Sequence, residues 1–320
     1  MIISCLHEGF SGGIGDFLRG SLYLKKYADS IGVNFGLNFK NHPIGEYIKS
    51  NSDEITKTII DLETYKHQNK DEEWHKKYPM SKWHLCLKEA LHKLLEEEDY
   101  NLNVSSYYHE SLHIDGMYML NHLNDYKIDK KLGQFFMDNI NFSNEVTEYA
   151  YELLDDIKFS KYNIIHLRMG DLNSWETNFK DVKIPDKYKD NINFRKFDHS
   201  YKRSLNVVLS LAQDDNTIIL SDNNSFKDYV QNQKINNLKV SHTCSAHSSL
   251  TPGLLILNNS KLNRNNKDLF YVAVDMFLLT KANRVNAYSV YDWGSGFPYW
   301  ISMFYGVPVK LYKLQAEPII

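Results

Sequence analysis

The sequence contains little cysteine, no long apolar run and no large excess of either charge. Its three cysteines, Cys5, Cys86 and Cys244, lie far apart without CxxC spacing, which predicts neither a disulfide framework nor a zinc knuckle. No window approaches the roughly 18 apolar residues of a membrane-spanning helix. The N-terminal residues lack the basic region and cleavage site of a signal peptide. We therefore expect a soluble, cytoplasmic protein without a transmembrane segment.

The charge balance argues against nucleic acid as a partner. The net charge is -3 and the isoelectric point is about 6.5, whereas a nucleic-acid-binding chain usually carries a basic field. Apolar residues make up 42% of the 320 residues, so the chain can bury a sizeable core. This length fits two domains of ordinary size.

Predicted strands and helices alternate along most of the chain. A strand at 1–7, a glycine loop, a helix at 18–32 and a strand at 33–39 form a first β–loop–α–β unit. A charged surface loop is predicted at 66–84 and an amphipathic helix at 81–99. Further helices are predicted at 144–157, 201–213, 225–231, 267–282 and 298–306, and further strands at 163–168, 216–222, 237–242, 284–288 and 307–312. Such alternation predicts an α/β fold with parallel sheets, and we place a domain boundary near residue 158.

The glycine-rich segment SGGIGDFLRG, residues 11–20, is the first candidate site. Gly13 and Gly15 allow a tight backbone near a helix N-terminus, where free N–H groups and the helix dipole favour an anion. Asp16 and Arg19 lie in the first helical turns, from which Arg19 could reach a ligand or be an ordinary surface arginine. The spacing is neither GxGxxG nor that of a P-loop. The alternative is a glycine turn that packs a helix on the sheet.

The segment YNIIHLRMGDLNSWE, residues 162–176, is the second candidate. A buried strand ends in His166 and Arg168, and Asp171 and Glu176 follow. The planar fork of an arginine binds diphosphate oxygens bidentately, and His166 can donate to a phosphate or a base. The alternative for Arg168 is a structural ion pair with Asp171.

Polar residues also end the strand at 216–222 and interrupt an apolar helix. Ser221 and Asp222 end that strand, and Asp222 could contact a ligand or cap the following helix. Asp275, within FYVAVDMFLL, needs a partner if it is buried. Its partner could be the N1–H and N2 amine of a guanine, Arg284, or a backbone group.

Two further features lie near the C-terminus of the chain. In DWGSGFPYW, residues 292–300, Ser295 and Gly296 open a helix, which again favours an anion. The aromatic residues of this segment could form a sugar platform or belong to the core. His242 and His247 flank Cys244, but no third ligand stands at a usual spacing, and we predict no metal site.

The order of these motifs resembles that of the fucosyltransferases with the two-domain GT-B fold, namely the alpha-1,2-, alpha-1,6- and protein O-fucosyltransferases. The resemblance covers residues 9–25 and 162–308 and centres on HxRxGD. It implies two Rossmann-like domains, at 1–158 and 159–320, with parallel sheets facing a central cleft. The alpha-1,2 and alpha-1,6 branches carry a second arginine directly after the first one, and this chain has Met169 at that position.

The resemblance also implies roles for individual residues. Arg168 would hold the β-phosphate of GDP-fucose, His166 would lie beside the nucleotide, and Asp275 would recognise guanine. The catalytic glutamate of the alpha-1,6 branch follows the motif histidine by ten positions, which is the place of Glu176 here. The implied donor site also includes the glycine loop and the Ser-Gly-Phe turn, namely Gly13, Gly15, Ser295, Gly296 and Phe297, and we add Asp16, Ser221 and Asp222 to it.

The resemblance therefore implies an inverting glycosyltransferase that needs no metal and no cofactor besides its donor, GDP-fucose. Arg168 and helix N-termini would stabilise the leaving diphosphate. Glu176, or failing it Asp171, would take the proton of the acceptor hydroxyl, which belongs to a glycan or glycoprotein. One alternative is a GT-B transferase for another nucleotide sugar such as ADP-heptose. Another is a non-catalytic nucleotide- or carbohydrate-binding protein of the same fold. The sequence predicts neither the acceptor nor the oligomeric state.

Overall fold

The computed structural model describes most of both sheets and the helices that cover them. The described residues are 1–5, 13–40, 43–53, 59–61, 101–105, 123–124, 126–168, 206, 208–210, 212, 215–222, 224–242, 266–289 and 294–314. The loop predicted at 66–84 and the helix predicted at 81–99 lie outside these ranges.

The N-terminal part of the chain forms a parallel sheet of order β2-β1-β5-β4. Its strands are β1 (Ile2–Cys5), β2 (Phe35–Asn38), β4 (Ile59–Asp61) and β5 (Asn101–Ser105). Helix α1 (Ile14–Ser30) connects β1 to β2 and ends near Gly32, which has a φ of 71°. This positive φ suits glycine because it has no Cβ. The β–loop–α–β unit predicted from the sequence is therefore confirmed.

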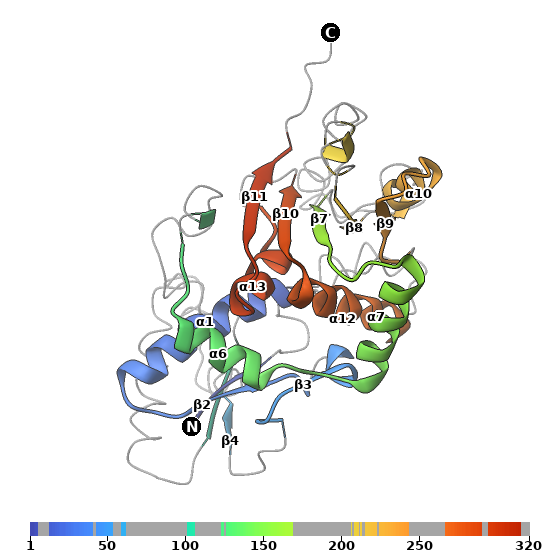
Figure 1. The fold of residues 1–320 in the computed structure, drawn as a ribbon. Coiled ribbons are helices and arrows are strands. Elements are labelled where there is room, and N and C mark those ends of the chain that lie inside the picture. Colours follow the sequence, from blue (N-terminus) through green and yellow to red (C-terminus); the bar gives the residue numbers. More distant parts are fainter. Residues whose placement is uncertain are drawn as a thin grey trace, which may run out of the picture.

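The C-terminal part forms a second parallel sheet, of order β11-β10-β7-β8-β9. Its strands are β7 (Asn163–Arg168), β8 (Thr217–Ser221), β9 (Leu238–Val240), β10 (Arg284–Ser289) and β11 (Val309–Lys313). Figure 1 shows these strands side by side. With two parallel sheets, and with a helix that follows each of β1, β8, β9 and β10, the predicted α/β class is confirmed.

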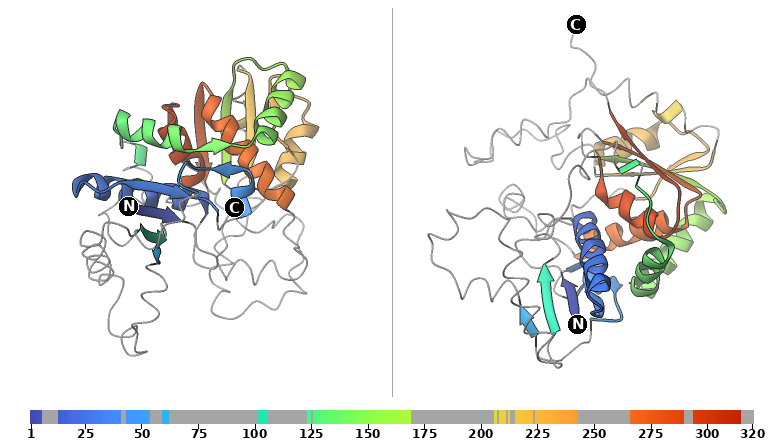
Figure 2. Two further views of the ribbon diagram at one scale, coloured as in Figure 1. Left: turned by 90° about the horizontal axis from the view of Figure 1, so that it is seen from below. Right: turned by 90° about the vertical axis from the view of Figure 1, so that its left-hand side faces the viewer.

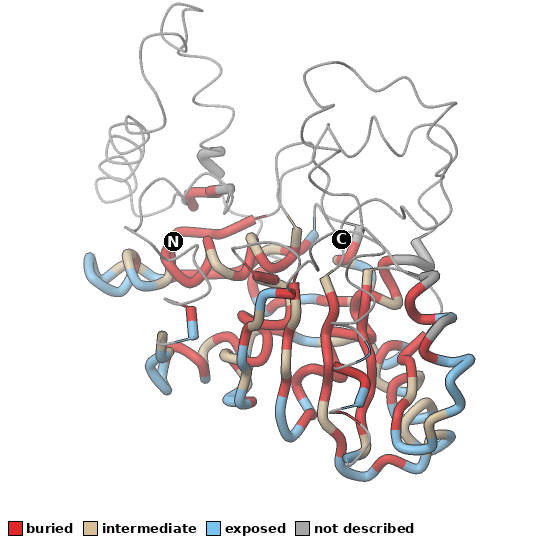
Figure 3. Tube along the Cα trace, turned by 90° about the horizontal axis from the view of Figure 1, so that it is seen from above, coloured by how far each residue is buried: buried red, intermediate tan, exposed pale blue. Residues whose placement is uncertain are grey.

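Both faces of the second sheet are covered. On one face, Ile164 and Ile218 join a large core that also includes residues of the first sheet and of α1. On the other face, Ile165 and Ile219 pack in a smaller core with Phe226 of α10 (Asn224–Asn232). Strands β7 and β8 are largely buried, whereas β11 has one buried residue, and Figure 3 draws buried residues in red. Because side chains alternate along a strand, His166 and Arg168 lie on the same face as Ile164.

Four helices complete the large core, namely α6 (Lys130–Asn139), α7 (Asn144–Ile157), α12 (Asn266–Lys281) and α13 (Gly296–Phe304). Asp129 caps α6 by accepting a hydrogen bond from the Lys131 N–H at 2.8 Å. Helix α6 packs on α13, where Phe136 stacks on Phe304 with ring centroids 4.0 Å apart. Helix α7 packs on α12. The views in Figure 2 show these helices beside the second sheet.

Segments that precede residue 158 thus pack on helices that follow it. A short helix, η1 (Pro43–Glu46), and the antiparallel pair of β3 (Ile48–Lys49) and β6 (Asn141–Phe142) add to these contacts. Each parallel sheet takes all its strands from one side of residue 158. The division into domains at 1–158 and 159–320 stays a prediction.

Candidate functional site

Helix α1 begins at the glycine loop, and Asp16 caps its first turn. Gly13, the N-cap residue, has φ −63° and ψ 170°, an ordinary extended conformation. Its N–H donates to Asp16 Oδ2 at 3.2 Å, and Arg19 Nη2 donates to Asp16 Oδ1 at 3.0 Å. The Asp16 carboxylate therefore accepts hydrogen bonds from the loop backbone and from Arg19. These contacts fix the first turn of the helix.

Gly15 lies directly against the start of α13. A Cβ added to Gly15 would lie 2.5 Å from the Phe297 backbone nitrogen and 2.6 Å from the Gly296 carbonyl carbon. Real Cβ atoms do not come so close to backbone atoms, so only glycine fits this position. Gly15 of the glycine loop and Gly296 of the Ser-Gly-Phe turn, which are 281 residues apart in sequence, therefore meet in the fold. Gly15 thus has a packing role, but against the start of α13 and not against the sheet, which was the alternative considered above.

Strand β7 carries His166 and Arg168 to its carboxyl end. His166 is buried, and its ring centroid lies 5.8 Å from that of Phe297. Burial, together with the nearby charge of Arg168, lowers the pKa of His166 to about 3. The ring is therefore neutral near pH 7. Its Nδ1 atom is buried and has no hydrogen-bond partner among the described residues.

Arg168 pairs with an acid of the neighbouring strand. Its Nε atom lies 3.5 Å from Oδ2 of Asp222, just after β8. The Arg168 side chain keeps 22% of its surface exposed, so a ligand can reach it. The hydroxyl of Ser221 donates to the Leu167 carbonyl at 3.0 Å and joins the ends of β7 and β8. Asp171, the ion-pair partner considered from the sequence, lies outside the described residues.

Asp275 of α12 pairs with a histidine. Nε2 of His242, just after β9, lies 3.0 Å from Asp275 Oδ1, and both residues are buried. Burial by itself would raise the pKa of Asp275, but His242 and the charge of Lys227 outweigh it, so this pKa is lowered.

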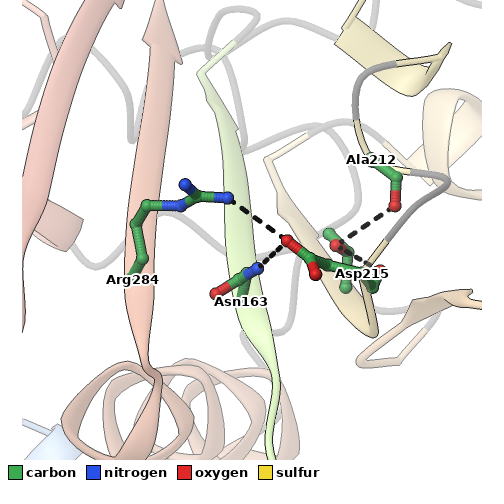
Figure 4. Close-up of polar contacts among 5 residues, drawn as sticks. Asn163, Ala212, Asp215 and Arg284 are labelled. Atoms are coloured by element: carbon green, nitrogen blue, oxygen red, sulfur yellow. Dashed lines mark hydrogen bonds and ion pairs between the residues drawn. The ribbon is translucent and has the colours of Figure 1, made fainter.

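The alternative pairing of Asp275 with Arg284 is wrong. Arg284 begins β10 at the opposite edge of the sheet, where Nη2 lies 3.5 Å from Asp215 Oδ2 (Figure 4). Asn163, which begins β7, also donates to this carboxylate, at 3.0 Å. Because both side chains of the Arg284 pair are more than half exposed, the pair belongs to the protein surface.

Lys227 is the residue of this site that the sequence did not indicate. It lies in the first turn of α10 and is fully buried, and its charge affects both His166 and Asp275. In sequence it is one lysine of a polar helix, SFKDYVQ, in which burial of the side chain is not expected. Its position in the first turn of the helix that follows β8 was the available signal.

Helix α13 begins at this same edge of the second sheet. Ser295 is its N-cap, and Gly296 and Phe297 belong to its first turn. The backbone N–H groups of a first turn have no acceptor within their own helix. Tyr299 and Trp300, which the sequence left open as a sugar platform or core, are 1% exposed and belong to the core. The edge thus combines a helix N-terminus, two cations and a neutral imidazole, which together suit an anionic ligand.

Several residues named from the sequence lie outside the described part of the chain. Among them are Asp171 and Glu176, as well as Cys244 and His247 beside His242. Within the described ranges, no group of three or more histidines, cysteines or acids is arranged to hold a metal ion. None of the described helices is both long enough and apolar enough to cross a membrane.

Comparisons with known proteins find similar folds but no similar sequences. No family model and no curated protein matches this sequence. Among solved structures, the chain is similar to NodZ alpha-1,6-fucosyltransferase soaked with GDP-fucose, with a TM-score of 0.47 and 10% identity over 95% of this chain and 91% of that one. Fucosyltransferase NodZ from Bradyrhizobium gives a TM-score of 0.46 and 11% identity over 94% and 91%.

POFUT1 in complex with GDP-fucose is a more distant neighbour, with a TM-score of 0.35 and 10% identity over 98% of this chain and 73% of that one. The two NodZ structures are named as fucosyltransferases, and POFUT1 is named as a complex with GDP-fucose. At such low identity the likeness concerns the fold. The residues of the site must therefore support any statement about activity by themselves.

Proposed function

We propose that the chain is an inverting glycosyltransferase that moves L-fucose from GDP-fucose to a hydroxyl group of a glycan or a protein, without a metal ion. One observation carries this proposal: the Gly15 turn, His166, Arg168 and the start of α13 meet at one edge of the second sheet. In open parallel sheets, ligands bind beyond the carboxyl ends of the strands.

Charge at this edge suits a nucleoside diphosphate as the leaving group. When the anomeric carbon–oxygen bond breaks, negative charge grows on the diphosphate, and fixed donors that face this charge stabilise the transition state. Arg168 is partly exposed and held by Asp222, so its guanidinium is positioned before a ligand arrives. The charge of Lys227 and the N–H groups of the first turn of α13 act in the same direction.

His166 takes part as a neutral hydrogen-bonding group. With a pKa of about 3, its ring holds no positive charge near neutral pH. A buried polar atom without a partner is unfavourable, and Nδ1 of His166 is such an atom among the described residues. In this proposal the donor nucleotide supplies the missing partner of Nδ1.

The acceptor side requires a base. Its hydroxyl oxygen attacks the anomeric carbon of fucose, GDP leaves with the bonding electron pair, and a carboxylate takes the hydroxyl proton. Glu176 is the base in this proposal, because it follows His166 by ten residues, as in the alpha-1,6 enzymes that the motif resembles. Asp171 is the second candidate.

A thermal-shift panel tests the choice of donor. Purified protein is heated with GDP, GDP-fucose, ADP or UDP, each with and without EDTA. A ligand at 100 times its dissociation constant stabilises the folded state by about 2.7 kcal/mol, which raises the melting temperature measurably. The proposal expects shifts with GDP and GDP-fucose alone that do not change with EDTA. A shift with ADP or UDP instead would overturn the donor, and a loss of the GDP shift in EDTA would overturn metal independence.

A further inference from the structure

A buried serine ends strand β10 beside Arg168. Ser289 is the last residue of β10, is fully buried, and stands opposite Arg168 in the parallel register of β10 and β7. Its hydroxyl donates to the Gly294 carbonyl at 3.2 Å, and its own carbonyl accepts from the Leu314 N–H at 2.8 Å. Because neighbouring strands are about 4.8 Å apart, Ser289 holds Gly294 one strand away from Arg168.

This hydrogen bond fixes the residue that precedes the N-cap of α13. Gly294 has a φ of 74°, a conformation that suits glycine, and the N-cap Ser295 follows it directly. A serine at this position usually accepts from an N–H of the first turn, but the Ser295 side chain makes no capping hydrogen bond. The third residue of the helix is Pro298, which has no N–H to donate. Ser289 therefore holds the start of α13 from outside the helix.

Two other contacts reach the same turn from different elements. Gly15 of α1 packs against the backbone of Gly296 and Phe297, and the ring of His166 lies 5.8 Å from that of Phe297. These are packing contacts, which limit how close the turn can come to α1 and β7. The contact with Ser289 is a hydrogen bond, which also fixes a direction. Loss of the Ser289 hydroxyl should therefore let the turn move relative to Arg168.

We propose that Ser289 is a positioning residue that holds the first turn of α13 against the same phosphate as Arg168, namely the β-phosphate of the donor. This inference rests on the proposed function, in which negative charge grows on the diphosphate as GDP leaves. The N–H groups of a helix start stabilise such a charge only where they are correctly placed. Ser289 ends the strand beside Arg168, so its hydrogen bond sets the distance between the helix start and the guanidinium.

A purely structural role for Ser289 makes a different prediction. If the serine only closed a turn, its loss would lower stability and weaken all nucleotides by the same factor. If it places the turn at the β-phosphate, its loss must weaken GDP more than GMP, which lacks that phosphate. The ratio of the two affinities separates these roles, because a general loss of stability does not alter it.

Isothermal titration calorimetry with GDP and GMP provides the test, on the full chain and four variants. Ser289→Ala removes the donor, and Ser289→Thr retains a hydroxyl. Gly294→Ala disturbs the same carbonyl through the positive φ of the glycine. Ser302→Ala is the matched control, because Ser302 is a fully buried serine of α13 whose hydroxyl has no hydrogen-bond partner among the described residues. Thermal melts confirm that each variant is folded.

We expect the ratio of GDP to GMP affinity to fall roughly 2- to 10-fold in Ser289→Ala, the range for one lost neutral hydrogen bond. Ser289→Thr should keep most of the ratio, Gly294→Ala should lower it, and Ser302→Ala should leave it unchanged.

An unchanged ratio in Ser289→Ala would overturn this inference alone, and so would an equal fall in Ser302→Ala. A wild-type protein that binds GDP no more tightly than GMP would overturn the diphosphate site of the proposed function, and this inference with it. If Ser289→Ala does not fold, an unchanged ratio in Gly294→Ala overturns the positioning role.

Discussion

Gly15 in the first turn of α1 packs against the peptide bond between Gly296 and Phe297, where even a methyl group would come within 2.5 Å of the Phe297 nitrogen. This contact joins the glycine loop near the N-terminus to the turn that begins α13. It fixes how these two segments lie relative to His166, whose ring faces Phe297.

Substitution Gly15→Ala should therefore affect both stability and nucleotide binding. Overpacking against backbone atoms costs about 1–3 kcal/mol, and relief of the clash requires a shift of the α13 turn. We expect a lower free energy of unfolding in denaturant titrations and weaker GDP binding. Gly32→Ala is the control, because its Cβ would meet no atom and only the strain of a φ of 71° remains, roughly 1–2 kcal/mol. Equal GDP affinity in both variants would contradict the role of this contact in the site.

Substitution Arg168→Lys should inactivate the protein almost as fully as Arg168→Ala. A lysine retains the positive charge, but it has no planar fork to hold Asp222 while it binds a phosphate. Turnover of GDP-fucose, followed by release of GDP, should fall by roughly 100-fold or more in both variants, as for other lost transition-state donors. Near-normal turnover of the lysine variant would show that charge alone suffices at this position.

The protonation of His166 should make the fold sensitive to acid. Its pKa is about 3 in the folded protein and 6.5 when unperturbed, so between these values only the unfolded state binds the proton. Stability therefore rises with pH in this window and is lost as the pH falls below about 6.5, by roughly 1.4 kcal/mol per pH unit.

The variant His166→Gln should lack this component of the acid sensitivity. The free energy of unfolding of both proteins is measured from about pH 7.5 down to about pH 4.5. Asp275 does not affect the comparison there. Because its pKa is lowered in the folded protein, its contribution to the free energy of unfolding decreases only when the pH falls below its ordinary pKa of 3.8. A difference between the two proteins that stays constant over this range would refute the neutral state of His166.

Core packing between α6 and α13 gives a prediction about stability alone. Phe136 is fully buried and stacks on Phe304 at 4.0 Å. Phe136→Ala should lower the free energy of unfolding by about 3–5 kcal/mol. Its neighbour Met137 is 37% exposed, and Met137→Ala should change stability by about 0.5 kcal/mol or less. Similar losses in both variants would contradict the packing of α6 on α13.

The sequence predicted the parallel arrangement well where apolar periodicity is strong. The predicted strand at 163–168 and helix at 144–157 match β7 and α7 residue for residue. Strand β5, NLNVS, was missed, because its alternate asparagines are rare in strands and only Leu102 and Val104 mark its apolar face. Helix α1 begins at Ile14, earlier than predicted. The Asp16 carboxylate accepts a hydrogen bond from the N–H of Gly13, so the helix starts within the glycine loop.

The site was predictable only in part, because sequence order does not show which strands are neighbours. His166 and Arg168 were placed correctly at a strand end by their pattern alone. The partners of Asp275 and Arg168 depend on the strand order β7-β8-β9, which brings His242 and Asp222 to the same edge. The burial of Lys227 likewise follows from tertiary packing.

The central claim is that a nucleotide binds at the carboxyl edge of the second sheet, and two arginines on neighbouring strands test it directly. Arg168 ends β7 at that edge, and Arg284 begins β10 at the opposite one. Calorimetric titration with GDP compares the wild type with Arg168→Ala and Arg284→Ala. Our account predicts normal binding by Arg284→Ala and no measurable binding by Arg168→Ala. Equal binding by the two variants would contradict it.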